Sequence, residues 1–166
     1  TQCIQAVNGV YQTLYSIYSS PDYWRMVDLG TDVAYSKDVN SAVQNYEFGS
    51  GNTGTGSLWL NAYEGIKNAN LVISRVSLAE IDDAIKERIL SEAKFLRALY
   101  YFNLSNTFGG VPLWTQEIDI DAVSSIGRSS LEEVRAQIIQ DLTDAEMGLP
   151  VSYPSTDIGR VTKGAA

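Results

Sequence analysis

The stretch Ser91–Leu113, SEAKFLRALYYFNLSNTFGGVPL, joins an apolar helix to an abrupt glycine- and proline-rich exit. Two apolar stripes at helical spacing run along this region and the turn before it. The first consists of Ile85, Ile89, Ala93, Leu96 and Tyr100, and the second of Phe95, Ala98 and Phe102. A helix with two such stripes packs against neighbours on two sides. The pattern therefore predicts a helix from about Asp82 to Asn106, inside a multi-helix stack and ended by Gly109, Gly110 and Pro112.

The sequence predicts further helices in the rest of the chain. Apolar spacing predicts one over about 2–18 and another over about 57–76. Between them, Pro21 fits the first position of a shorter helix capped by Ser20 and ended by Gly30. Ser130 and Glu133 form a capping-box pattern that opens a helix closed near Gly148 and Pro150, and another helix is expected near Val161.

Two segments are not helical in this interpretation. Residues 31–57 are rich in Gly, Ser, Asn and Thr and form a long connection, which is typical of functional or disordered loops. Residues 111–123 are expected to be extended, and the polar–apolar alternation over residues 117–121 predicts a short strand or a segment that wraps along an edge. The sequence thus predicts an all-α fold of antiparallel helix pairs, and the spacing from Ala98 to Phe102 matches one part of the tetratricopeptide pattern.

Composition excludes several function classes. The chain of 166 residues has 45% apolar residues, a net charge of −8 and no His. The acidic balance argues against nucleic-acid binding, because phosphate contacts need a basic face. The absence of His removes Ser-His-Asp and Cys-His catalysis as well as His-based metal sites. The acidic pairs Asp82–Asp83 and Glu132–Glu133 fall at helix starts, where carboxylates complement the helix dipole. We therefore expect no enzyme activity, no cofactor and no metal.

One motif favours a different function. Residues 49–54, GSGNTG, satisfy the G-x-G-x-x-G pattern of dinucleotide-binding folds. That interpretation requires a second strand over Leu71–Val76, with Glu80 on the ribose, whereas helical spacing continues from Trp59 to Ile73. A flexible loop explains the glycines more simply. Nucleotide binding remains an alternative hypothesis that fails if residues 70–76 are helical.

The long loop also contains aromatic residues among polar ones. Tyr35, Tyr46 and Phe48 share it with Asp32, Lys37, Asn45 and Asn52. Aromatic faces beside amides and carboxylates suit sugars, because the C–H face of a pyranose stacks on a ring while its hydroxyls take polar partners. The alternative is that these rings only anchor the loop to the helices.

Four ordered motifs resemble the SusD/RagB family of outer-membrane glycan-capture lipoproteins. The first is EAKFLRA at 92–98, followed by Tyr100–Phe102 and by FGGVPL at 108–113. The others are WLNAYEGIKNAN at 59–70, IIQDLTDAEMGLP at 138–150 and GRVTKGAA at 159–166. The resemblance covers essentially the whole chain.

This resemblance implies a tetratricopeptide-like helical architecture, with residues 1–166 as the N-terminal helical part of a longer protein whose C-terminal portion is absent. It implies non-catalytic capture of oligosaccharides or polysaccharides on the extracellular face of the outer membrane and delivery to a TonB-dependent, SusC-like transporter barrel. The membrane link is a lipid anchor outside this chain, so Cys3 is not the lipid-bearing residue. A helical-repeat scaffold that contacts only proteins is the alternative function.

The resemblance also places part of the sugar site in the loop before the helix that starts near Trp59. By position, Tyr46 or Phe48 would stack on the glycan, and Asn52 and Asp32 would supply polar contacts. The family's aromatic-x-x-Asn arrangement is not reproduced, because residues 49 and 51 are both Gly. Glu92 and Arg97 are expected to serve packing and charge pairing and not ligand binding.

Overall fold

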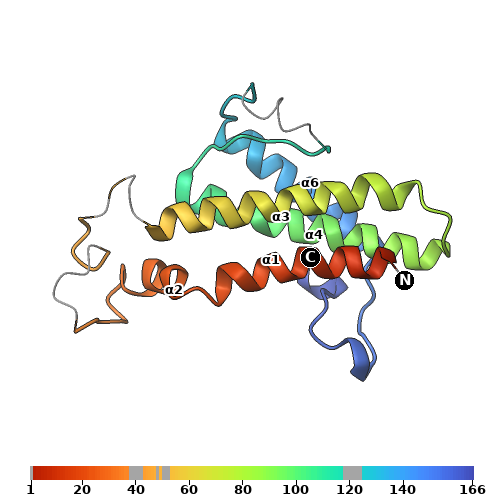
Figure 1. Cartoon of the computed structure of the whole chain (residues 1–166), viewed down its shortest axis with the longest axis horizontal. Coiled ribbons are helices and arrows are strands. Elements are labelled where there is room, and N and C mark those ends of the chain that lie inside the picture. Colours follow the sequence, from red (N-terminus) through yellow and green to blue (C-terminus); the bar gives the residue numbers. More distant parts are fainter. Residues whose placement is uncertain (1, 38–42, 48, 50–52, 118–124) are drawn as a thin grey trace.

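The computed structural model describes residues 2–37, 43–47, 49, 53–117 and 125–166. Its long helices are α1 (Gln2–Tyr18), α3 (Thr53–Ser77), α4 (Asp83–Phe108) and α6 (Leu131–Gly148). The shorter elements are α2 (Pro21–Asp28) and the 3₁₀ turns η1 (Ser155–Asp157) and η2 (Lys163–Ala165). Within these residues all regular structure is helical, which confirms the all-α prediction (Figure 1).

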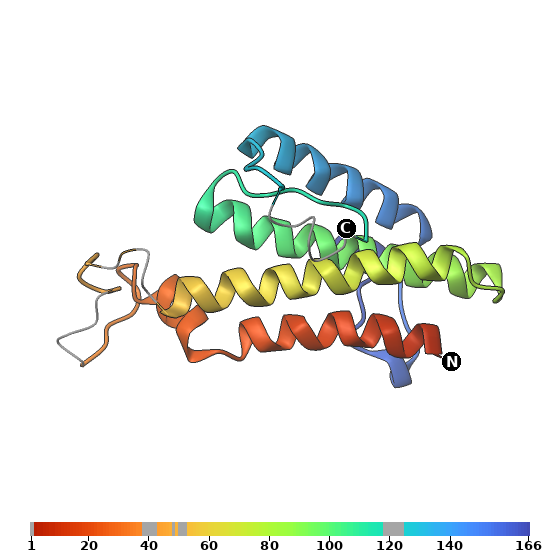
Figure 2. The same ribbon diagram turned by 45° about the horizontal axis from the view of Figure 1, so that its top comes forward.

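The long helices pack side by side in the order α1, α3, α4, α6 (Figure 2). α3 and α4 run antiparallel through a short turn at 78–82 and form the centre of the bundle, as predicted. α1 packs mainly on α3, α6 packs on α4, and α2 packs on the start of α3. The described residues of the loop after α2, 31–37 and 43–47, lie beyond one end of the bundle in both views (Figures 1 and 2).

Regular apolar spacing explains why these helices associate. On α3 the fully or nearly fully buried side chains recur every three or four residues: Leu58, Ala62, Ile66, Ala69, Val72 and Val76. They face the α4 stripe, of which Ile89, Ala93, Leu96 and Tyr100 are completely buried. The prediction was wrong for Ile85, the first residue of one stripe, and for Phe102, the last residue of the other. Their side chains are 38% and 50% exposed. The apolar burial on both central helices supplies most of the driving force for the fold.

Helix ends follow local sequence signals. Asp82 caps α4 by accepting a hydrogen bond from the Ile85 N–H, and Ser130 with Glu133 forms the predicted capping box of α6. Gly109 ends α4 at φ 73°, and its N–H donates to the Ser105 carbonyl. Positive φ is open to glycine without the steric cost that other residues meet, so this position fixes the sharp exit.

Three sequence expectations need correction. α3 begins at Thr53 and not near Ser57, so it includes two of the loop glycines. The helix expected near Val161 is only the 3₁₀ turn η2. The nucleotide-binding alternative is wrong, because Leu71–Val76 is helical within α3 and cannot be the second strand that it needs. Of the segment 111–123, residues 111–117 contain no strand, and residues 118–123 lie outside the described residues.

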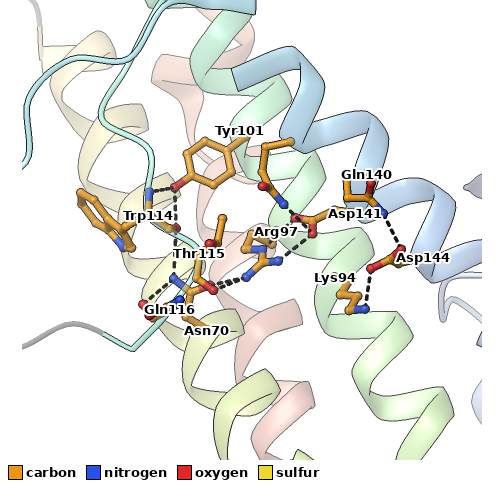
Figure 3. A network of polar contacts seen from close by, with 11 residues as sticks. Asn70, Lys94, Arg97, Tyr101, Trp114, Thr115, Gln116, Gln140, Asp141 and Asp144 are labelled. Carbon is orange, nitrogen blue, oxygen red and sulfur yellow. Dashed lines mark hydrogen bonds and ion pairs between the residues drawn. The ribbon is translucent and has the colours of Figure 1, made fainter. Parts of the chain in front are cut away.

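The segment after α4 is fixed by a buried polar network (Figure 3). Asn70 donates to the carbonyls of Trp114 (3.2 Å) and Gln116 (3.1 Å), and Arg97 donates to the carbonyl of Thr115 (2.8 Å). The Tyr101 hydroxyl also accepts from the Trp114 N–H at 2.9 Å. Side chains of α3 and α4 therefore satisfy backbone groups that an isolated extended segment would leave unpaired.

A second buried network joins the C-terminal segment to the bundle. Glu92, which is completely buried on α4, accepts from Arg160 at 2.8 Å and from the Tyr153 hydroxyl at 3.2 Å. Arg160 also reaches Asn8 on α1 at 2.8 Å. Glu92 and Arg97 thus have the structural pairing that the sequence predicted for them.

No helix of the described residues has the length and apolar character needed to cross a bilayer.

Candidate functional site

A groove of about 880 Å³ opens at the end of the bundle where the long loop begins. Three helices and the loop line it: α2, the first turns of α3, the last turns of α4, and Gly49. Its size lies within the range of roughly 300–1,000 Å³ that ligand sites usually have. Because α3 and α4 are antiparallel, the start of one and the end of the other meet here. The fold itself therefore brings these segments together.

The aromatic wall of the groove rests on the core. Trp59 packs edge-on against Phe108, with ring centroids 5.1 Å apart, and lies 4.9 Å from Tyr63. Tyr63 in turn stacks on Trp114 at 4.7 Å and donates its hydroxyl to the Pro112 carbonyl at 2.8 Å. Interlocked rings of this kind hold Trp59 in one orientation. The extended segment after α4 thereby braces one wall of the groove.

Asn103 fixes the opposite side. Its amide exchanges hydrogen bonds with the Tyr18 hydroxyl, donating at 3.0 Å, and it accepts from the Tyr23 hydroxyl at 3.4 Å. Tyr18 and Tyr23 contact each other edge-on at 4.9 Å. Burial, with Tyr18 nearby, raises the pKa of Tyr23 to about 12, so its hydroxyl stays protonated at neutral pH. This cluster ties the α1–α2 corner to α4 and places Tyr23 on the groove wall.

Other groove residues are at least partly exposed to solvent. Phe102 is half exposed, and Asn106 and Thr107 are exposed on the last turns of α4. Thr55 adds a hydroxyl from the first turn of α3. The groove thus combines ring faces with amide and hydroxyl groups, a set that can stack on a sugar ring and hydrogen-bond its hydroxyls.

Two of the four predicted site residues are described. Tyr46 is 73% exposed, adopts φ 56°, and donates its hydroxyl to the Gly30 carbonyl at 2.6 Å. A positive φ is uncommon for a bulky residue, so this contact holds the Tyr46 backbone in a costly conformation. Asp32 is exposed on the same loop. Neither is among the described residues that line the groove. Phe48 and Asn52 lie outside the described residues.

The groove was not predicted from the sequence, because its aromatic residues were interpreted as buried core residues. Trp59 and Phe102 were placed on helix stripes, and Asn103 and Asn106 were given no role. One signal was present: Asn103 and Asn106 are three residues apart, directly after the aromatic Phe102, near the end of the predicted helix. Residues at that spacing share a helix face. Amides on such a face next to a long polar loop indicate a site.

Comparison with known proteins places the chain among SusD-like proteins. A SusD-like family model described as starch-binding and associating with the outer membrane matches residues 4–166. SusD-like protein P25 of Formosa agariphila is 30% identical over 98% of this chain and 33% of its own length. The chain thus spans about a third of that relative.

Solved structures agree with this fold. A laminarin-binding SusD-like protein superposes with a TM-score of 0.85 at 28% identity, over 98% of this chain and 37% of that one. A SusD-like protein from Bacteroides fragilis gives 0.83 at 27% identity, over 96% and 31%. The helical fold therefore matches the tetratricopeptide-like fold of SusD-like proteins, as the four motifs predicted. The chain belongs to the SusD-like family of the SusD/RagB group.

Proposed function

We propose that the full-length protein captures oligosaccharides or polysaccharides at the outer face of the outer membrane, without cleaving them, and delivers them to a TonB-dependent, SusC-like transporter. The observation that carries the proposal is the groove between α2, α3 and α4, in which aromatic rings and amides surround a space of ligand size. The adjacent loop with Tyr46, Asp32, Phe48 and Asn52 would extend this surface.

The physical basis is the match between groove and sugar. A pyranose presents an apolar C–H face and a rim of hydroxyls. The half-exposed ring of Phe102 offers a stacking surface, and Asn106 offers an amide donor and acceptor. The Thr107 hydroxyl donates to the Asn103 carbonyl at 3.0 Å and offers its oxygen as an acceptor. Trp59 and Asn103 are held in place by core contacts, so little conformational entropy is lost when a ligand binds.

The comparisons support this class of ligand. The matching family model is described as starch-binding, and one structural relative is described as laminarin-binding. The transporter partner and the lipid anchor follow only from the family resemblance. Because the chain spans about a third of its curated relative, the remaining part of the protein would complete the site and the partner contacts.

Retention of the full-length protein in gels containing polysaccharide tests the proposal. We expect retention by at least one glycan, and Phe102→Ala should weaken it about tenfold, as truncation of a central aromatic contact usually does. Leu60→Ala is the matched control, because Leu60 is 71% exposed on α3 and does not line the groove.

Two outcomes would contradict parts of the proposal. Equal retention of Phe102→Ala and the parent protein would exclude the groove as the binding site. Co-purification with a membrane barrel, without retention by any glycan, would favour the protein-only scaffold instead.

A further inference from the structure

The residues described in the lining of the groove carry no charged side chain. Its described lining consists of aromatic, aliphatic, glycine, amide and hydroxyl residues, and none of them is acidic or basic. The chain as a whole is different, because it carries 12 basic and 20 acidic residues. A neutral groove of this size on a strongly charged protein is informative about the ligand.

The adjoining loop strengthens the contrast. Between residues 31 and 57 the sequence has three acidic residues, Asp32, Asp38 and Glu47, and only one basic residue, Lys37. Residues 48–57, which lead into α3 and contribute Gly49, Thr55 and Gly56 to the groove, carry no charge at all. Of the loop residues that the structure describes, the acidic Asp32 and Glu47 outnumber the basic Lys37, so an anionic ligand that enters from this side would meet net negative charge.

The helix dipoles do not compensate for the missing cations. The first turn of α3, with Thr55 and Gly56, directs partial positive charge toward the groove. The last turns of α4, with Thr107 and Phe108, and of α2, with Met26 and Val27, carry partial negative charge. Arg128 partly offsets this charge at α4 by donating to the Phe108 carbonyl at 2.7 Å, and neither Arg128 nor the last-turn Arg25 of α2 is among the residues that line the groove. One helix N-terminus and two helix C-termini meet at the groove. The partial charges of these helix ends therefore supply no net attraction for a carboxylate or sulfate.

We propose that the portion of glycan held in this groove is uncharged, so that the protein selects neutral polysaccharides over uronic acid-containing or sulfated ones. This inference rests on the proposed function and narrows its ligand class. Moving an anion from water into a groove without a cationic partner costs desolvation free energy that no contact there returns. A neutral sugar loses only hydroxyl–water hydrogen bonds, which the exposed Asn106 amide and the Thr107 hydroxyl oxygen can replace.

The test compares four polysaccharides with the full-length protein: laminarin and amylopectin as neutral ones, alginate and κ-carrageenan as anionic ones. We expect retention by at least one neutral glycan, with an affinity that changes less than about twofold between about 20 mM and about 300 mM salt, because no ion pair is screened. Retention only by alginate or carrageenan would overturn the inference while leaving glycan capture intact. Retention by none of the four would overturn glycan capture as well.

A charge-insertion variant assigns the selectivity to the groove. Asn106→Lys places an ammonium on an exposed groove position, and we expect it to lower the affinity for the neutral glycan about tenfold and to create salt-sensitive retention by alginate. Thr143→Lys is the matched control, because Thr143 is exposed on α6 and does not line the groove. If both lysine variants bind the neutral glycan as the parent does, the groove is not the selective site and the inference fails.

Discussion

Arg97 on α4 and Asp141 on α6 form a two-point ion pair buried between the two helices (Figure 3). The guanidinium Nε and Nη2 donate to the two carboxylate oxygens at 2.7 and 2.6 Å, and the exposed fractions of the two residues are 4% and 1%. The remaining nitrogen, Nη1, donates to Asn70 at 2.7 Å and to the Thr115 carbonyl. One side chain on α4 therefore connects α3, α6 and the segment that braces the groove.

Breaking this pair from one side should destabilise the protein strongly. Arg97→Met leaves the Asp141 carboxylate buried beside Gln137 alone, and we expect a loss of about 3–5 kcal/mol in the free energy of unfolding. The double variant Arg97→Met/Asp141→Leu removes both charges and should recover part of that loss. Urea denaturation measures both values. If the double variant loses more free energy of unfolding than the two single variants lose together, the buried-pair account is contradicted.

The close approach of α3 and α4 depends on a glycine. A Cβ added at Gly65 would collide with the Tyr100 ring, which is completely buried and donates its hydroxyl to the Val10 carbonyl. We expect Gly65→Ala to cost about 1–3 kcal/mol through overpacking.

Gly9 on α1 provides the matched control for this substitution. An added Cβ there meets nothing within 4 Å, so Gly9→Ala should stabilise by about 0.5–1 kcal/mol through helix propensity. Thermal denaturation of both variants measures whether each substitution raises or lowers the stability of the protein. A stabilising Gly65→Ala would mean that the helices are farther apart than described.

Local signals explain which parts of this fold the sequence could predict. Pro21 starts α2, and Ser130 with Glu133 starts α6, because caps act within one turn of the residue that makes them. Tyr101 shows where prediction from local signals fails. It was on neither predicted stripe, yet it is completely buried, because residues 111–117 fold back over its face of α4.

The site was less predictable for the same reason. Asn103 reaches Tyr18 across 85 residues of sequence, and the groove is formed by the ends of helices whose antiparallel pairing brings them together. Spacing along one helix contains no information about such partners. The polar connection that composition predicted over residues 31–57 is shorter than expected, because α3 already begins at Thr53, and its role in binding remains a prediction.

Alkaline pH should unfold the protein through its buried tyrosines. Burial raises the pKa of Tyr100 and Tyr101 well above the usual value near 10, and the same holds for Tyr11, Tyr63 and Tyr153. The folded state then holds protons that the unfolded state releases above about pH 10. Stability is therefore constant below that pH and falls as the pH rises beyond it, by up to about 1.4 kcal/mol per pH unit for each fully buried tyrosine.

The melting temperature measured from neutral pH to about pH 11 checks this sign and window. Tyr101→Phe is the diagnostic variant. It loses the hydrogen bonds with Trp114 at 2.9 Å and should be less stable at neutral pH, but it should show a flatter decline above about pH 10. An unchanged alkaline slope in this variant would mean that Tyr101 ionises as freely in the folded chain as in the unfolded one.

The loop prediction can be separated from loop stability at Tyr46. If the Tyr46 ring stacks on a glycan, Tyr46→Phe keeps the ring and should bind as the parent does, apart from the lost hydrogen bond to Gly30, whereas Tyr46→Ala should weaken binding about tenfold. Because Tyr46 is 73% exposed, neither variant should shift the melting temperature by more than a few degrees. Phe48→Ala, measured in parallel by titration calorimetry with the retained glycan, distinguishes which aromatic stacks. Unchanged affinity in both alanine variants would exclude the loop aromatics as ligand contacts and leave the groove between α2, α3 and α4 as the binding surface of this part of the protein.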